Sequence, residues 1–304
     1  MPEVEEKRAA ARGSVAASVA LTTLKIVVGL LTGSLGILAE AAHSALDLVA
    51  ALVTLFAVRL SSKPADREHT YGHGKIENLS ALLETALLLL TCGWIIRAAV
   101  LRLLHHAVEM EVTVWSFAVM ATSIVVDWSR ARVLRRTALR YNSQALEADA
   151  LHFETDVWSS AVVIAGLVGV LAAARYPSVV WLRYADAVAA LAVAVIVVWV
   201  SVKLGLRTIY YLVDTAPSGL EEKILSEVRG VAGIAACDHL RMRYSGPTLF
   251  VDVRIEVDGN QSLRDAHRIT EEVESAVQRI SPAADVTVHA EPPNAHSGQH
   301  AAHR

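Results

Sequence analysis

Long apolar segments constrain the fold of this chain more than any other feature. Six stretches of membrane-spanning length follow one another with short polar connections, at roughly 13–34, 37–60, 78–104, 112–134, 145–174 and 181–207. A helix crosses the hydrocarbon core of a bilayer with about 20 apolar residues. Composition agrees, because 54% of the 304 residues are hydrophobic and only 19% are charged, against about 25% charged in soluble domains. We therefore predict an all-α membrane domain of six transmembrane helices over residues 13–212.

The positions of lysine and arginine predict the orientation of these spans. The loop after the second span carries Lys63, Arg67 and Lys75, and five arginines lie between residues 130 and 140. The opposite side has fewer basic residues. Because cytoplasmic loops are enriched in Lys and Arg, we expect both termini, including the charged segment 1–12, to lie in the cytoplasm. The expected location is a bacterial inner (plasma) membrane, with the lipid bilayer as the surrounding partner.

The chain becomes soluble in composition from about Pro217. Residues 213–292 alternate as helix, strand, strand, helix and strand, and Ser262 is a plausible N-cap for the second helix. This order predicts a small cytoplasmic α+β, ferredoxin-like C-terminal domain. Three strands and two helices bury little surface, so we expect the domain to gain stability by pairing with a second copy. Residues 293–304 are expected to be a disordered tail.

Two copies of one polar pattern interrupt the apolar segments. His43 and Asp47 lie in the second span, and His152 and Asp156 lie in the fifth. Residues four apart share one face of a helix, and ionisable groups inside a membrane usually bind an ion, line a cavity or pair. Two nitrogen and two oxygen ligands suit tetrahedral zinc or a similar divalent metal. The alternative is two buried polar pairs that hold helices together, but the matched duplicate favours transport of a metal ion.

These features resemble the cation diffusion facilitator family of divalent-metal transporters. Further resemblance comes from the loop Asp66-Arg-Glu-His-Thr-Tyr-Gly-His-Gly-Lys-Ile-Glu77, the turn Ser245-Gly-Pro-Thr248 and the ending His289-Ala-Glu-Pro292. The resemblance implies a homodimer of six-span subunits that alternate between inward-facing and outward-facing states. It also implies that metal leaves the cytoplasm in exchange for protons. In this family, His on both metal-binding spans goes with zinc, often with cadmium accepted.

The resemblance implies two features of the loop after the second span. Asp66, His69 and His73 correspond to a second metal site near the cytoplasmic surface, and the alternative is a solvated polar loop. Lys75 and Asp214 resemble an interlocking ion pair near the dimer centre, and the alternative is two unrelated exposed charges.

The resemblance implies a further metal site in the soluble domain, which would regulate transport and dimerisation. The positions that match the family's cytoplasmic ligands are Asp238, His267, His289 and Glu291. One position that is often His in the family is Arg254 here, and a fixed cation opposes metal binding. Asp252, two residues earlier on the same strand face, is a possible substitute. We therefore expect a single site in place of a two-metal cluster.

The predicted function is a proton-coupled antiporter that exports zinc, with cadmium as a second accepted ion. The same fold moving ferrous iron, manganese, cobalt or nickel is an alternative, because ligand identity only biases the choice of metal. A non-transporting metal sensor and a membrane metal enzyme are alternatives from other classes. We expect no enzyme, because four ligands close the coordination shell and no separate general base is evident. The net charge of −3 is too small to suggest nucleic acid as a partner.

Overall fold

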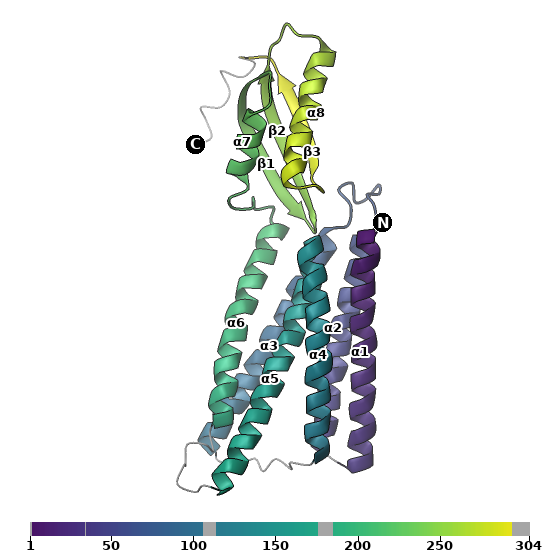
Figure 1. Ribbon diagram of the computed structural model, residues 1–304, viewed down its shortest axis with the longest axis vertical. Coiled ribbons are helices and arrows are strands. Elements are labelled where there is room, and N and C mark those ends of the chain that lie inside the picture. The colour runs from purple at the N-terminus through teal and green to yellow at the C-terminus, as the bar shows by residue number, and fades with distance from the viewer. Residues whose placement is uncertain (1, 34, 106–113, 176–184, 294–304) are drawn as a thin grey trace. The chain divides into compact units, whose positions relative to one another are not determined.

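The computed structural model describes residues 2–33, 35–105, 114–175 and 185–293. The chain divides into two compact units, residues 1–209 and 210–304. The first unit is helical and the second contains a small sheet (Figure 1). This is the predicted pairing of an all-α membrane domain with an α+β C-terminal domain.

The first unit is built from long helices that match the predicted spans in number and order. They are α1 (Pro2–Thr32), α2 (Leu35–Ser61), α3 (Lys75–His105), α4 (Val114–Tyr141), α5 (Gln144–Arg175) and α6 (Ala185–Leu212). Helices α1, α2, α3 and α6 each contain a stretch long and apolar enough to cross a membrane. The predicted starts of the fourth and sixth spans, at 112 and 181, lie outside the described residues. Segment 1–12 continues α1, so the charged N-terminal residues from Pro2 onwards are helical.

Small side chains let these helices approach closely. Buried residues that belong to one apolar cluster with Phe153 include Ala11, Ala57, Ala131 and Ala150. In a membrane, where lipid tails are as apolar as leucine, close packing of small residues is a main source of helix association. Helices α1, α2, α4 and α5 therefore form one packed group, which fixes the relative positions of α2 and α5.

A buried ionic cluster joins the N-terminal ends of α1 and α3 to this group. Lys7 Nζ lies 2.5 Å from Glu77 Oε1, and both side chains are buried. The hydroxyls of Ser61 and Ser143 also donate to the Glu77 carboxylate. Because a buried carboxylate is stable only when it is paired and hydrogen-bonded, Glu77 fixes the start of α3 directly after the loop that carries Asp66, His69 and His73.

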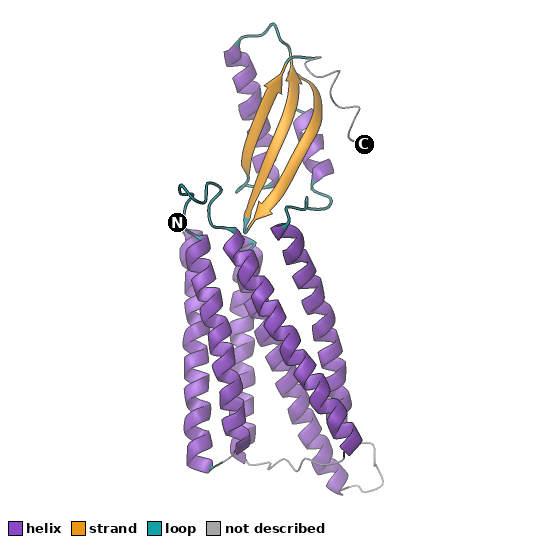
Figure 2. Cartoon of the chain, turned by 180° about the vertical axis from the view of Figure 1, so that it is seen from behind, coloured by secondary structure: helices purple, strands orange, loops and turns teal. Residues whose placement is uncertain are grey.

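The second unit has the predicted order of elements. It contains α7 (Glu221–Arg229), β1 (Ile234–Ser245), β2 (Thr248–Val257), α8 (Leu263–Ile280) and β3 (Asp285–Glu291). The sheet order is β1-β2-β3, with β1 antiparallel and β3 parallel to β2. Both helices lie on one face of this sheet (Figure 2), where alternate β2 residues such as Val251 and Ile255 are buried. The other face carries the charged side chains.

Local details of this unit follow from its sequence. Ser262 caps α8, because its side chain accepts a hydrogen bond from the Asp265 N–H. Strand β1 begins at Ile234, and its pairing with β2 has two register irregularities before His239, which interrupt the period-2 pattern in its first half. Gly233 has a φ of +94°, and a Cβ there would lie 2.7 Å from Ile269 Cδ1. Only glycine therefore fits this turn without displacing Ile269.

Candidate metal sites

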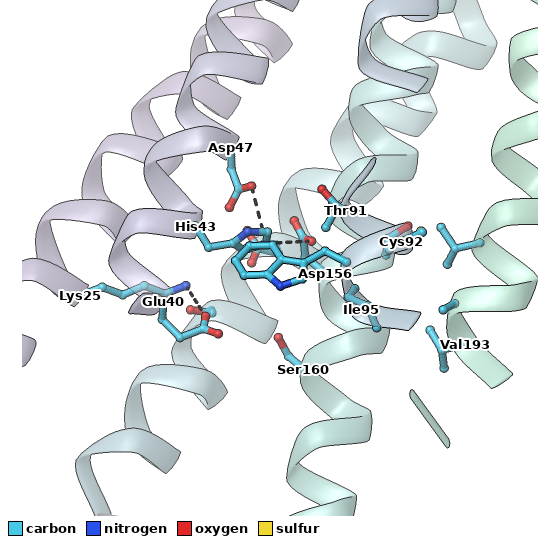
Figure 3. Close-up of a pocket in the computed structure, with 16 residues that line it drawn as sticks. Lys25, Glu40, His43, Asp47, Thr91, Cys92, Ile95, Asp156, Ser160 and Val193 are labelled. Atoms are coloured by element: carbon cyan, nitrogen blue, oxygen red, sulfur yellow. Dashed lines mark hydrogen bonds and ion pairs between the residues drawn. The ribbon is translucent and has the colours of Figure 1, made fainter. Parts of the chain in front are cut away.

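Helices α2 and α5 bring the two His/Asp pairs into one cluster. His152 Nε2 lies 3.1 Å from Asp47 Oδ1 and 3.7 Å from Asp156 Oδ2. His43 Nε2 lies 3.9 Å from a carboxylate oxygen of Asp47 and of Asp156 (Figure 3). Four ligand atoms bound to one zinc at 2.0–2.1 Å in a tetrahedron are about 3.3 Å apart. Asp47, His152 and Asp156 lie close enough together to hold one divalent cation, whereas His43 lies outside this close group, at 3.9 Å from each carboxylate. The His43 side chain must therefore move to complete a four-ligand shell.

A cavity of about 320 Å³ opens directly onto this cluster. His43, Asp47 and Asp156 line it, whereas His152 does not. The side chain of His43 is 33% exposed and that of His152 is 7% exposed. His152 therefore closes one side of the cluster, and the other three candidate ligands face the cavity.

Two fixed cations near the cavity are engaged by other anions. Lys25 Nζ lies 3.3 Å from Glu40 Oε2 and donates to Ser44 Oγ at 2.7 Å. Arg130 Nη1 donates to Asp127 Oδ1 at 3.0 Å. Glu40 and Asp127 both line the cavity with His43. Each cation thus has a carboxylate that is not one of the four candidate ligands.

Sequence reasoning missed a buried carboxylate one helical turn before His152. Asp149 has no exposed surface, and its Oδ2 accepts a hydrogen bond from Ser14 Oγ at 3.1 Å. Ser14 also accepts from Arg130 Nη2 at 3.0 Å, which connects Asp149 to the α1–α4 contact. The sequence signal for Asp149 is an acidic residue inside the apolar fifth span, close to the His152/Asp156 pair.

The loop between α2 and α3 gathers its three predicted ligands. Asp66 Oδ1 lies 3.3 Å from His69 Nδ1, and Asp66 Oδ2 lies 3.4 Å from His73 Nε2. The backbone N–H groups of His69 and Glu68 donate to the Asp66 carboxylate, and the His69 contact is the main reason that the pKa of Asp66 is lowered below its ordinary value. Gly72, with a φ of +77°, supplies the turn that brings His73 back to Asp66.

The soluble domain does not gather its predicted ligands into one group. His289 Nε2 lies 3.1 Å from Glu291 Oε1, but Arg254 Nε lies 3.8 Å from the same oxygen. Asp252 lies 3.8 Å from Arg241, and His267 lies 3.7 Å from Glu271 on α8. The side chain of Asp238 is outside the described part. Among the described residues, groups of three or more close ligands are found only in the membrane cluster and the loop.

Lys75 and Asp214 lie in different units, so their pairing stays a prediction. Lys75 is the first residue of α3. Asp214 has a φ of +59° and lies 3.4 Å from Arg243 Nη1, at the start of the second unit.

Comparison with known proteins matches both units. The "Cation efflux transmembrane domain" matches residues 12–213, and the "Cation efflux protein, cytoplasmic domain" matches residues 216–293. The chain belongs to the cation diffusion facilitator family. It is 32% identical over 292 residues to the cation-efflux pump FieF of Salmonella arizonae, covering 93% of this chain and 92% of that one. It is 34% identical over 290 residues to the FieF of Citrobacter koseri, covering 94% and 92%.

Solved structures similar to the chain include the C-terminal domain of MamM in a nickel form. It is 28% identical and covers 25% of this chain and 98% of that one, with a TM-score of 0.24. The family match over almost the whole chain makes this protein a multi-pass membrane transporter for the efflux of cations.

Proposed function

We propose that this transporter exports zinc from the cytoplasm in exchange for protons, with cadmium as a second accepted ion. The observation that carries the proposal is the convergence of two imidazoles and two carboxylates from α2 and α5, with nitrogen–oxygen separations of 3.1–3.9 Å. Borderline zinc takes such a mixed nitrogen and oxygen set readily, whereas harder cations such as Mg²⁺ and Mn²⁺ prefer oxygen ligands.

Exchange follows from the chemistry of these ligands. Metal binds neutral imidazole and ionised carboxylate, so each binding event releases whatever protons those four groups carried. Imidazole changes its charge near neutral pH, which makes protons effective competitors for the same atoms. Protons that enter from the cavity side displace the metal, and metal that arrives from the cytoplasm displaces the protons.

The loop group of Asp66, His69 and His73 is proposed to bind metal at the cytoplasmic surface before it reaches the membrane cluster. The membrane is proposed to be a bacterial inner membrane, with both termini in the cytoplasm. Two copies are proposed to form a homodimer through the C-terminal domain, in which a looser metal site at His289 and Glu291 favours transport.

Other functions of the chain would be indicated by other experimental results. Transport of ferrous iron, manganese, cobalt or nickel by the same cluster would keep the mechanism and change the ion. A metal sensor has no need for a complete ligand set inside the membrane. We propose no enzymatic activity, since the relatives named above are efflux pumps.

The decisive experiment is metal-driven proton flux in proteoliposomes that contain the purified full chain. Zinc, cadmium, manganese and ferrous iron are compared for the native chain and for Asp47→Ala. The matched control is Glu222→Gln, which removes an exposed carboxylate on α7. We expect zinc flux in the native chain and control, and none in Asp47→Ala. Zinc uptake without opposing proton movement would contradict the exchange, and flux with manganese or iron alone would contradict the choice of zinc.

A further inference from the structure

A basic and aromatic stripe runs along an exposed face of α4. Trp128, Arg132 and Arg136 follow at four-residue intervals, so they lie above one another on the helix. All three are exposed. The guanidinium of Arg132 lies 4.5 Å from the centre of the Trp128 ring, which fixes its orientation.

Helix α5 supplies the other wall of a groove beside this stripe. The groove has a volume of about 550 Å³ and includes Val157 and Trp158 from α5. The Trp158 ring is 63% exposed, and Trp128 is 53% exposed. Exposed tryptophan side chains on membrane helices, here one on α4 and one on α5, are typical of the level where acyl chains meet headgroups.

The charges in the groove do not cancel. Its carboxylate is Glu154, which is held by Arg135 through both Nε and Nη2. Among the described residues, Arg132 and Arg136 have no carboxylate within ion-pair distance. The groove therefore presents two guanidinium groups without an anion, beside an apolar wall, on a domain that lies in lipid.

We propose that this groove binds an anionic phospholipid, with its phosphate on Arg132 and Arg136 and its acyl chains along Trp128, Val157 and Trp158. Planar guanidinium groups bind phosphate oxygens in bidentate fashion. Basic pockets between transmembrane helices on the cytoplasmic side are suited to lipids such as cardiolipin. A zwitterionic lipid brings its own cation and leaves the two arginines uncompensated. The proposal rests on the cytoplasmic orientation of this end of α4 given under the proposed function.

The position of the groove allows a bound lipid to affect the metal cluster through α5. Glu154 lies between His152 and Asp156 on α5, and Arg135 ties it to α4. A lipid that bridges α4 and α5 at this level holds the helix that supplies half of the metal ligands. We therefore expect the lipid to stabilise the α4–α5 pair and to change transport without entering the metal site.

The test counts lipids bound to the purified full chain by native mass spectrometry, without metal and in detergent. Cardiolipin and phosphatidylglycerol are compared with phosphatidylcholine for the native chain, for Arg132→Gln/Arg136→Gln, and for Arg132→Lys/Arg136→Lys. The matched control is Arg229→Gln/Arg264→Gln, which removes two exposed charges from the soluble domain. We expect anionic lipid to bind the native chain and the control. The Gln pair should bind it at least about tenfold more weakly, because two charge-assisted contacts are lost. The Lys pair should fall between, which also shows that the groove tolerates substitution.

Three results would overturn the proposal. Equal retention of phosphatidylcholine would show that charge plays no part. Displacement of the lipid by excess inorganic phosphate would show a simple anion site to which the acyl chains add nothing. A cysteine placed by Arg136→Cys that forms a disulfide between subunits would show that a second copy covers the groove. Because binding is measured without metal, a failure here leaves the exchange mechanism untouched, and the flux assay above tests that mechanism separately.

Discussion

The membrane cluster and the open face of the C-terminal sheet carry the same kinds of side chain but organise them in opposite ways. In the membrane, the neighbouring cations Lys25 and Arg130 each have a separate carboxylate. On the sheet, Arg254 and Arg241 approach the candidate ligands Glu291 and Asp252 themselves. A set of metal ligands is available to a metal only where fixed cations nearby are satisfied by other anions.

Burial strengthens this difference. The side chain of His152 is 7% exposed and that of His289 is 70% exposed. Charges inside a membrane are costly unless they are compensated, so a buried group of two carboxylates requires a counter-ion, either protons or metal. The exposed sheet has water and Arg254 for that purpose. We therefore expect the buried cluster to need a bound ion more than the exposed sheet does.

The largest expected effect separates the two histidines. His152→Ala removes the ligand that closes the cluster, and we expect metal-driven proton flux to fall to that of empty liposomes. His289→Ala leaves the membrane cluster intact, and we expect at least about half of the flux to remain, since exposed surface substitutions away from special features are mild. Equal losses in the two variants, at equal amounts of inserted protein, would mean that the cytoplasmic residue is also essential.

A second prediction concerns a variant of the sheet in which the fixed cation beside the candidate ligands is replaced by an imidazole. Arg254→His removes the fixed cation beside Glu291 and places an imidazole opposite His289 in the β2–β3 register. We expect the variant to bind zinc at His289 and Glu291 with measurably higher affinity than the native chain, because two imidazoles and a carboxylate then share this site. Calorimetric titration in an Asp47→Ala background isolates the effect. Arg241→His is the control, since it changes the same charge next to Asp252, and an equal gain there would show a nonspecific effect of charge.

The contrast between these regions was only partly predictable from the sequence. Spacing was enough for the membrane cluster, because residues four apart share a helix face and the two pairs are duplicates. The family resemblance, together with the fixed charge of Arg254, also indicated that this residue would oppose metal binding. The contact of Asp149 with Ser14 joins residues that are far apart in sequence, and no local pattern specifies it. Likewise, Lys25 pairs with Glu40 only because α1 packs against α2.

A third and smaller effect concerns the loop group, in which Asp66 and His69 are about half exposed and the His73 side chain is 9% exposed. Its ion pairs among the described residues include no arginine. The pKa of Asp66 is already lowered by backbone hydrogen bonds, so its carboxylate stays ionised well below neutral pH, and its contribution is lost only as pH falls through that lowered value. We expect Asp66→Asn in an Asp47→Ala background to weaken loop zinc binding by a similar factor throughout about pH 5–7, above the ordinary aspartate range. A competition titration with a zinc dye measures this. A deficit that disappears toward pH 5 would show that Asp66 itself titrates there.

The smallest expected effect tests whether the C-terminal domain folds without metal, as its apolar core of Ile224, Val251 and Val273 indicates. Ser262→Ala removes the cap of α8, and we expect a loss of about 1 kcal/mol in the local stability of that helix. Hydrogen exchange of the α8 amides in the full chain measures it, with and without a chelator. Ser226→Ala, which loses only a hydroxyl contact within α7, is the control. If the chelator alone accelerates exchange in α8 as much as the cap variant does, metal contributes to the fold of this domain. The membrane cluster and the C-terminal sheet would then both bind metal and differ only in affinity.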